Sequence, residues 1–395
     1  MEEDRIYEER TFQTTSEIQV YPTWESMNLK PELLTSIHKL NWEKPSQIQS
    51  RAIVPMAQGR SMLVQSQNGT GKTATFSIGS LQRLKLTAKH TELIVISPTR
   101  ELAIQSEKTL KSLGANVRSC VGGNSLGDDV RALRNPIHCI SGTPGRLLQL
   151  IHEHNIDPSK LKVVVLDEAD EMLQSNKRAI TDILTLLVEA VHPQIVIITA
   201  TVSPEVIELK QEFIPKGLEI LVPRDELSLL NIDQYMVKIP GGEEYKFNAL
   251  TDLYQSVAIE RAIIFVNTKE KGKWLKQQMI DSGFTVDLAI SDLKMGEREQ
   301  IVRNFKDGET RVLIASDMWA RGIDVKNVSL VINFDIPTQT DIYLHRIGRS
   351  GRFGRKGIAI TFVANDSDEK KIRKIEKYYS SKINPLPSDL DSLYF

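Results

Sequence analysis

Residues 66–73, with the sequence Ser-Gln-Asn-Gly-Thr-Gly-Lys-Thr, have the composition of a loop that binds a polyphosphate. The loop follows an apolar run at 62–64 and precedes a helix-compatible stretch, a context in which backbone N–H groups can surround phosphates. Lys72 would contact the β and γ phosphates, and the Thr73 hydroxyl would bind Mg²⁺. The strict pattern of phosphate-binding loops has Gly at the position of Ser66. The alternative interpretation of this segment is therefore a glycine-containing turn before an ordinary helix. The residues expected to hold the phosphates are Gly69, Thr70, Gly71, Lys72 and Thr73.

An acidic cluster, Asp-Glu-Ala-Asp at 167–170, closes the apolar strand expected at 163–166. A carboxylate at this position, downstream of a phosphate-binding loop, can hold Mg²⁺, and we assign this role to Asp167. Glu168 is then placed to polarise a water that attacks the γ-phosphate. A solvated acidic helix start is the alternative. The phosphate-binding loop upstream favours nucleotide hydrolysis.

Trp42 and Gln49 lie seven residues apart, upstream of the loop. An aromatic face can stack on a purine, and a carboxamide can both donate to and accept from the adenine edge. Ser46 is expected to cap the helix that carries Gln49. A core tryptophan and a surface glutamine are the alternative interpretation of this pair.

A basic segment at 345–352 lies in the second half of the chain. Arg349 and Arg352 are three residues apart and can form one guanidinium cluster that contacts a phosphate, as arginine fingers supplied in cis do. A basic strip for nucleic-acid phosphates is the alternative. His345 has no His or Cys at ligand spacing, which argues against a metal site there.

Four further loops carry Arg, hydroxyl or glycine N–H groups, the donors that contact nucleic-acid phosphates and sugars. They have no set of aromatic residues for stacking and no reading helix, so sequence-independent binding is expected. The loops are 98–102, 122–123, 143–146, and 316–317 with 321–324.

Short β-branched runs alternate with helical segments along the whole chain, which predicts parallel sheets covered by helices on both faces. The strands expected in the first half are 62–65, 93–97, 138–141, 163–166, 195–199 and 218–222. Those expected in the second half are 234–239, 262–267, 286–290, 311–316, 330–334 and 358–363. We therefore predict a flexible arm at 1–22, a first domain at 23–222, a linker at 223–233 and a second domain at 234–395.

The composition fits a two-domain globular protein, because 395 residues with 41% hydrophobic and 26% charged residues are enough for two cores. The net charge is −1, and residues 1–240 carry −3 while residues 241–395 carry +2. Neither half is strongly basic, so a nucleic-acid surface must be a local strip. Two cysteines, Cys120 and Cys139, indicate no disulfide framework. No apolar run is long enough to span a bilayer, and the acidic N-terminus is unlike a signal peptide.

In its ordered motifs the sequence closely resembles the DEAD-box family of ATP-dependent RNA helicases, from about Trp24 to the C-terminus. The motifs are Lys44-Pro45-Ser46 with Gln49, the phosphate-binding loop, Pro98 to Ala103, Thr143 to Arg146, Asp167 to Asp170, Ile264 to Thr268, Ala320 to Asp324, and His345 to Arg352. The resemblance implies an α/β fold of two tandem RecA-like domains that close on ATP and RNA.

By match to these motifs, each part of the site has expected residues. Trp42 and Gln49 would bind adenine, and Gly322 and Asp324 would contact the nucleotide, the latter at its ribose. Catalysis would involve Lys72, Asp167, Glu168, Arg349 and Arg352, with Mg²⁺ held by Thr73 and Asp167. RNA would contact Arg100, Gly123, Thr143, Gly145, Arg146, Asn267, Thr268 and Ser316. Coupling of hydrolysis to unwinding would involve Asp170, Thr199, Thr201 and His345.

Within the family, the compact length resembles the translation initiation factor 4A branch, and segments 319–322 and 378–385 most resemble its nuclear members. Those members act in the exon-junction complex of animals or, in yeasts, in small-subunit ribosomal RNA processing. We favour local unwinding of single-stranded or short duplex RNA in 18S rRNA maturation, by a nucleolar monomer assisted by a protein cofactor. An ATP-locked RNA clamp in an mRNA-bound complex and a cytoplasmic location are the alternatives. A duplex-DNA translocase is disfavoured because the motifs are of RNA type.

The chain departs from the family pattern at Ser66, Asn68, Thr199, Ile290 and Met295, and lacks the Gly-Phe expected within 174–178. The family's Ser-Ala-Thr is Thr199-Ala200-Thr201 here, which keeps a hydroxyl and adds a methyl group. These changes remove no catalytic group, so we expect them to affect efficiency alone.

Overall fold

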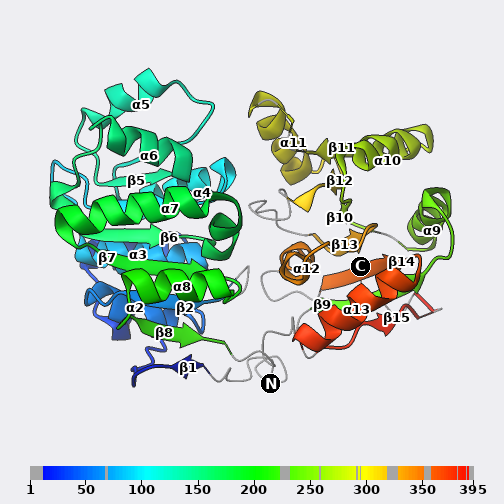
Figure 1. Cartoon of the computed structure of the whole chain (residues 1–395), viewed down its shortest axis with the longest axis horizontal. Coiled ribbons are helices and arrows are strands. Elements are labelled where there is room, and N and C mark those ends of the chain that lie inside the picture. The colour runs from blue at the N-terminus through cyan, green and yellow to red at the C-terminus, as the bar shows by residue number, and fades with distance from the viewer. Residues whose placement is uncertain are drawn as a thin grey trace. The chain divides into compact units, whose positions relative to one another are not determined.

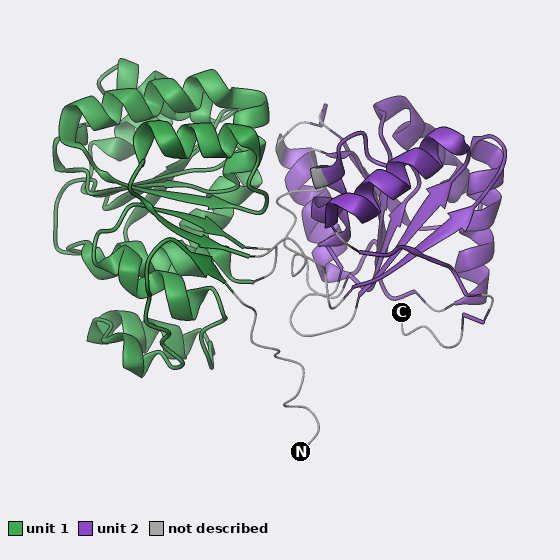
Figure 2. Ribbon diagram, turned by 60° about the horizontal axis from the view of Figure 1, so that its bottom comes forward, with its two compact units in different colours: residues 1–223 green, residues 224–395 purple. Residues whose placement is uncertain are grey.

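The computed structural model describes residues 12–66, 70–222, 232–257, 259–290, 292–293, 295–317, 328–350, 357–379, 381–387 and 389–390. The chain divides into two compact units, 1–223 and 224–395 (Figure 2), and each is described by itself. Each unit is built on one predominantly parallel sheet.

In the described residues of unit 1, eight strands form one sheet in the order β1-β8-β2-β7-β6-β3-β5-β4 (Figure 1). Every neighbouring pair is parallel except β1 with β8. The strands are β1 Gln13–Thr14, β2 Met62–Gln65, β3 Leu93–Ile96, β4 Val117–Cys120, β5 Cys139–Gly142, β6 Val163–Leu166, β7 Gln194–Thr199 and β8 Leu218–Leu221. The helices are α1 Pro31–Lys39, α2 Gln49–Ala57, α3 Lys72–Arg83, α4 Arg100–Ser112, α5 Leu126–Leu133, α6 Pro144–His152, α7 Ala169–Val191 and α8 Pro204–Phe213.

The unbroken apolar sequence of β6 is explained by cores on both faces of the sheet. Val163 and Val165 pack in one core with residues of α2 and α3. Val164 and Leu166 pack in the other with residues of α7 and α8. Burial on both sides is what makes a central parallel strand apolar at every position.

Two parts of unit 1 differ from the sequence-based expectation. The first is β4, which lies at the end of the sheet; its sequence Val-Arg-Ser-Cys is half polar and offers no apolar run. The second is the arm, because Gln13 and Thr14 pair with the edge strand β8, and Phe12 lies 4.7 Å from the Arg51 guanidinium. Residues 12–14 are therefore attached to unit 1, since β8 offers backbone groups for pairing. Residues 1–11 of the predicted arm lie outside the described residues.

Unit 2 has the strand order β11-β12-β10-β13-β14-β9-β15, with every neighbouring pair parallel. The strands are β9 Ile232–Lys238, β10 Ala262–Phe265, β11 Val286–Ala289, β12 Val312–Ala315, β13 Leu330–Asn333, β14 Gly357–Val363 and β15 Asn384–Pro385. The helices are α9 Glu243–Ser256, α10 Lys269–Asp281, α11 Met295–Asp307, α12 Thr340–Ile347 and α13 Asp366–Tyr379. β9 begins at Ile232, inside the predicted linker, and the rest of that linker, 223–231, lies outside the described residues.

One core of unit 2 joins α9 and α10 to the sheet, through residues such as Leu250, Leu275 and Ile264. Ile290 packs in the same core and is 4% exposed. Burial therefore explains the apolar side chain at position 290, one of the departures noted in the sequence. α12 and α13 contact each other, and the Tyr379 hydroxyl donates to the Thr340 carbonyl over 3.0 Å.

Candidate active site

Three neighbouring strands of unit 1 bring the nucleotide-site residues together. β2, β7 and β6 are adjacent and parallel, so the segments at their carboxyl ends meet at one edge of the sheet. There the Lys72 ammonium lies 2.7 Å from Glu168 Oε1, and both side chains are buried. The predicted phosphate-binding lysine and the predicted water-positioning carboxylate are thus in direct contact.

Glu168 has a left-handed backbone, with φ 54° and ψ 54°, between β6 and α7. This conformation is uncommon for a residue with a side chain and is typical of functional positions. It allows the chain to turn from the strand into the helix while Glu168 reaches Lys72.

The segment around Ser46 and Gln49 is hydrogen-bonded to the phosphate-binding loop. Ser46 Oγ accepts from the Gln49 N–H over 3.4 Å, and Gln49 Oε1 accepts from the Ser46 N–H over 2.7 Å. This reciprocal pair joins Ser46 to the first residue of α2, whose N-cap is Ile48 and not the predicted Ser46. Ser46 Oγ also lies 2.7 Å from the Thr70 carbonyl, and Gln49 Nε2 donates to the Gly71 carbonyl over 3.4 Å.

Gly71 must be glycine for two reasons. Its φ is 91°, and a Cβ there would lie 2.5 Å from Gln49 Nε2, so a side chain would strain the backbone and displace the amide.

Trp42 is half-buried against the core of unit 1 and its carbonyl accepts from Trp24 Nε1 over 2.9 Å. Gln49 therefore touches the loop directly, whereas Trp42 is packed beside the core.

The oxygen donors near Lys72 fit a hard divalent cation. Burial and the neighbouring Glu168 carboxylate raise the pKa of Asp167 to about 7. A bound cation would relieve this by stabilising the ionised form. Thr73 lies half-buried in the first turn of α3. A carboxylate and a hydroxyl are ligands that Mg²⁺ accepts together with phosphate oxygens.

A buried hydrogen-bond network joins the ends of β6 and β7. Asp170 Oδ2 accepts from the Thr201 N–H over 3.1 Å and from Thr201 Oγ1 over 2.6 Å. Thr199 Oγ1 donates to the Thr201 carbonyl over 2.7 Å. The Ser66 N–H donates to the Thr199 carbonyl over 3.0 Å, and Ser66 Oγ contacts Thr70 Oγ1. Ser66 and Thr199, two of the departures from the family pattern, are thus hydrogen-bonded to each other and to neighbouring residues of the site.

The predicted nucleic-acid loops of unit 1 also converge. Arg100 lies over Gly123, whose φ is 90° and whose Cβ, if present, would be 2.4 Å from Arg100 Nη1. Thr143 precedes α6, and a Cβ on Gly145 would enter open space. The space beside the backbone is therefore open at Gly145, whereas at Gly123 the Arg100 guanidinium occupies it.

Arg146, also predicted to bind RNA, is engaged within the protein. It forms an ion pair with Asp129 and donates through Nη2 to the Asn124 carbonyl over 2.8 Å, and its side chain is 9% exposed. Asp129 is fully buried and also pairs with Arg118 at 2.6 Å. Sequence reasoning missed Asp129, because an aspartate in the first turn of a helix is ordinarily explained by the helix dipole.

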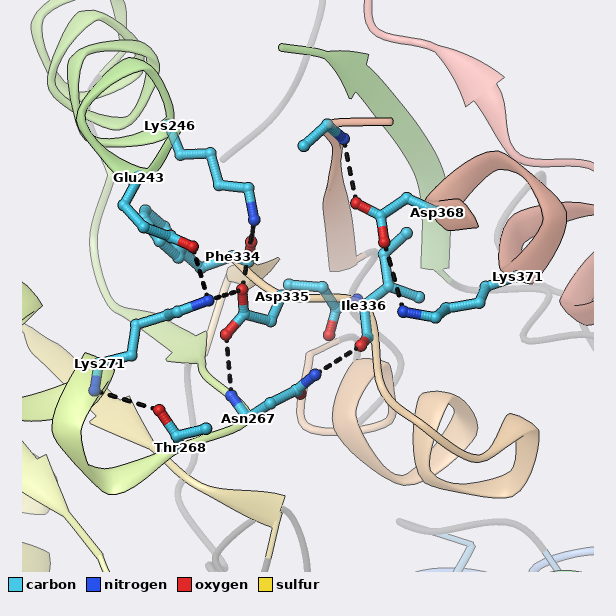
Figure 3. Close-up of polar contacts among 12 residues, drawn as sticks. Glu243, Lys246, Asn267, Thr268, Lys271, Phe334, Asp335, Ile336, Asp368 and Lys371 are labelled. Atoms are coloured by element: carbon cyan, nitrogen blue, oxygen red, sulfur yellow. Dashed lines mark hydrogen bonds and ion pairs between the residues drawn. The ribbon is translucent and has the colours of Figure 1, made fainter. Parts of the chain in front are cut away.

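In unit 2, β10 and β12 are neighbours, so the predicted RNA residues at their ends are on the same edge of the sheet. Asn267 Nδ2 donates to the Ile336 carbonyl over 2.9 Å (Figure 3). Thr268 Oγ1 caps α10 by accepting from the Lys271 N–H over 3.2 Å. Ser316 follows β12 and its N–H donates to the Ala289 carbonyl over 3.1 Å.

His345 and Arg349 are both buried, at α12 and just after it, and Arg349 Nε donates to the His345 carbonyl over 3.3 Å. Sequence reasoning gave no role to Arg346 between them. This fully buried guanidinium lies 2.5 Å from Asp317 and donates to Asn267 Oδ1 over 2.7 Å and to the Asp335 carbonyl over 2.6 Å.

The predicted site residues Gly69, Gly322, Asp324 and Arg352 lie outside the described residues.

Comparisons with known proteins match this arrangement. The DEAD/DEAH box helicase family model matches residues 46–209, and the helicase conserved C-terminal domain model matches residues 245–354. The chain is 48% identical over 385 residues to the ATP-dependent RNA helicase FAL1 of Meyerozyma guilliermondii, with 96% of each chain covered. The chain belongs to the DEAD-box family of ATP-dependent RNA helicases. The helicase is also 46% identical to eukaryotic initiation factor 4A of Dictyostelium discoideum, over 96% of this chain and 94% of that one.

Solved structures confirm the predicted fold class for the helicase. Saccharomyces cerevisiae Dbp5 bound to RNA and ADP BeF3 is 32% identical, with a TM-score of 0.85 over 93% of this chain and 96% of that chain. Dbp5 bound to Nup159, Gle1, IP6 and ADP matches with a TM-score of 0.64. The fold is two tandem RecA-like domains, and the enzyme is an RNA helicase and ATPase of the initiation factor 4A-like branch. Among the described residues, no helix has the length and apolarity needed to cross a membrane.

Proposed function

We propose that this helicase uses RNA-stimulated ATP hydrolysis to unwind short RNA duplexes, or to remodel RNA–protein particles, during 18S rRNA maturation. The chemistry rests on one observation above all: the contact of Lys72 with Glu168, beside buried Asp167. A nucleotide bound there would have its γ-phosphate within reach of a cation, a metal-binding carboxylate and a water-positioning carboxylate.

In this proposal Thr73 and Asp167 would hold Mg²⁺, which would supply positive charge beside the phosphates. Lys72 leaves its pairing with Glu168 for the phosphates, and Glu168 orients the attacking water. Arg349 and Arg352 of unit 2 reach the γ-phosphate only when both units engage the same nucleotide. Hydrolysis then depends on RNA, because a strand bound to loops of both units favours that closed state.

The helicase would read the RNA backbone and 2′-hydroxyls, since its candidate loops offer hydroxyls, arginines and glycine N–H groups. The strand must bend or unpair to contact both units, and release of the hydrolysis products would reset the cycle. The RNA-bound Dbp5 structure supports this proposal. The Dbp5 structure with Nup159 and Gle1 supports a protein cofactor that regulates closure.

The ribosomal role is supported by the 48% identity to a yeast helicase over nearly the full length of both chains. It would place the protein in the nucleolus. The alternative is an ATP-locked clamp in an mRNA-bound complex. This alternative is supported by the 46% identity to initiation factor 4A.

Replacing the protein in its source organism with the Glu168→Gln variant separates these roles. We expect precursors of 18S rRNA to accumulate and mature 18S rRNA to fall relative to the large-subunit rRNA, measured by hybridisation with spacer probes. Unchanged 18S precursors together with an early loss of translation initiation would contradict the ribosomal role and favour the mRNA role.

A further inference from the structure

A buried aspartate outside the motifs listed above connects three elements of unit 2. Asp335 follows β13 and is 5% exposed. Its Oδ2 accepts from the Asn267 N–H over 3.0 Å, and its Oδ1 lies 2.7 Å from the Lys271 ammonium and 3.2 Å from the Lys246 ammonium (Figure 3). One carboxylate thus binds the end of β10, the first turn of α10 and α9.

The contacts to β10 fix the turn that leads into α10. The Asp335 N–H donates to the Phe265 carbonyl over 3.2 Å, and Asn267 Nδ2 donates to the Ile336 carbonyl. With the bond from the Asn267 N–H to Asp335, the end of β10 is joined to residues 335–336 by three hydrogen bonds. The Asn267 N–H and side chain therefore anchor the turn to residues 335–336.

The contact with Lys271 fixes the first turn of α10. Lys271 also pairs with Glu243 at 2.7 Å, while its own N–H donates to Thr268 Oγ1. Asp335 therefore holds the side-chain ammonium of Lys271, and Thr268 holds its backbone N–H. A helix start held in this way presents its N–H groups to an anion without further ordering.

The electrostatics keep Asp335 ionised. Burial alone would raise its pKa, but the bonds from Lys271 and the Asn267 N–H and the charge of Lys246 bring the pKa below its usual value. Both carboxylate oxygens face donors. An asparagine side chain here could accept hydrogen bonds through its one oxygen only. Its NH₂ group would face either the Asn267 N–H or the lysine ammoniums, which are themselves donors.

We propose that Asp335 is a positioning residue for RNA binding, which holds Asn267, Thr268 and the first turn of α10 in the conformation that receives the RNA backbone. The proposal rests on the proposed function, in which RNA binds the candidate loops, including the one that carries Asn267 and Thr268. Asp335 itself does not contact RNA or ATP.

The test measures ATP hydrolysis of the full chain against the concentration of an unstructured single-stranded RNA. For Asp335→Asn we expect the half-saturating RNA concentration to rise about tenfold, the equivalent of one charge-assisted hydrogen bond. The turnover at saturating RNA should stay within about twofold, since the nucleotide site is untouched. A role in stability alone would lower the active fraction, and with it the turnover, but would not move the half-saturating concentration.

Two further variants keep the test decisive if Asp335→Asn folds poorly. Lys246→Met removes a cation from the same carboxylate and leaves the Asn267 and Lys271 contacts, so its half-saturating concentration should match that of the wild type. The double variant Asp335→Asn with Lys246→Met no longer has the Lys246 ammonium buried beside an uncharged side chain. Its melting temperature should therefore return toward the wild-type value, while its affinity for RNA should stay low. Lys271→Met breaks the contact with α10 and should raise the half-saturating concentration several-fold.

The outcomes are distinguishable. If wild-type turnover does not respond to RNA, the proposed function fails, and this inference fails with it. If RNA stimulates the wild type but Asp335→Asn keeps the wild-type half-saturating concentration, the positioning role is wrong and the proposed function stands. Equal effects of Asp335→Asn and Lys246→Met would also overturn it, because general loss of packing would then explain both.

Discussion

We expect Glu168→Gln to lower the RNA-stimulated turnover of ATP by about 10²–10⁴-fold, the usual contribution of a positioned general base. The amide keeps the size of the side chain and its place 2.7 Å from the Lys72 ammonium, but it cannot accept the proton of the attacking water. ATP should still bind, because Lys72, Thr73 and Gly71 are unchanged. Steady-state phosphate release at saturating ATP and RNA measures the effect.

The matched control is Glu189→Gln, which makes the same change at an exposed position of the same helix, α7. It should leave turnover within about twofold, as exposed substitutions generally have small effects. A Glu168→Gln protein that binds ATP, melts as the wild type does and retains full turnover would exclude Glu168 as the water-positioning group.

Arg349→Lys is the second variant with a large expected effect, a loss of turnover on the order of 10³-fold, as when an arginine finger is removed. Lysine keeps one positive charge but lacks the planar fork that binds phosphate oxygens in pairs. Arg349 is 5% exposed and its Nε donates to the His345 carbonyl, so thermal melting must be measured beside turnover. The control is Arg373→Lys, since Arg373 is 77% exposed on α13.

Binding of ATP and of RNA by the Arg349→Lys protein should change far less than its turnover, because the arginine acts on charge that develops in the transition state. Turnover within about threefold of the wild type, in a variant that melts normally, would show that Arg349 does not act on the γ-phosphate. The cis-finger part of the proposal would then be wrong.

Local patterns predicted the strands well because central parallel strands are apolar on both faces. Val163–Leu166 is a clear case, and its residues alternate between the two cores of unit 1. β4 was missed because an edge strand needs fewer apolar residues. Near the N-terminus, a short 3-10 helix, Glu25–Met27, and α1, Pro31–Lys39, are separated at Asn28, whose φ is 52°.

Contacts between distant side chains could not be predicted. The sequence placed Asp167, Glu168 and Lys72 at strand ends, and the sheet order then brought them together. Neither Asp129 nor Asp335 belongs to a motif quoted from the sequence, and their importance follows from ion pairs formed across the fold. Burial of a carboxylate among cations depends on tertiary packing, which no local pattern encodes.

The central claim is that RNA controls ATP hydrolysis through groups from both units. The most direct test is the steady-state rate of ATP hydrolysis by the intact protein, with and without saturating single-stranded RNA. The account predicts at least a tenfold higher rate with RNA, roughly the effect of 1.4 kcal/mol on the barrier. Equal rates with and without RNA, at saturating ATP and with RNA binding verified separately, would contradict it.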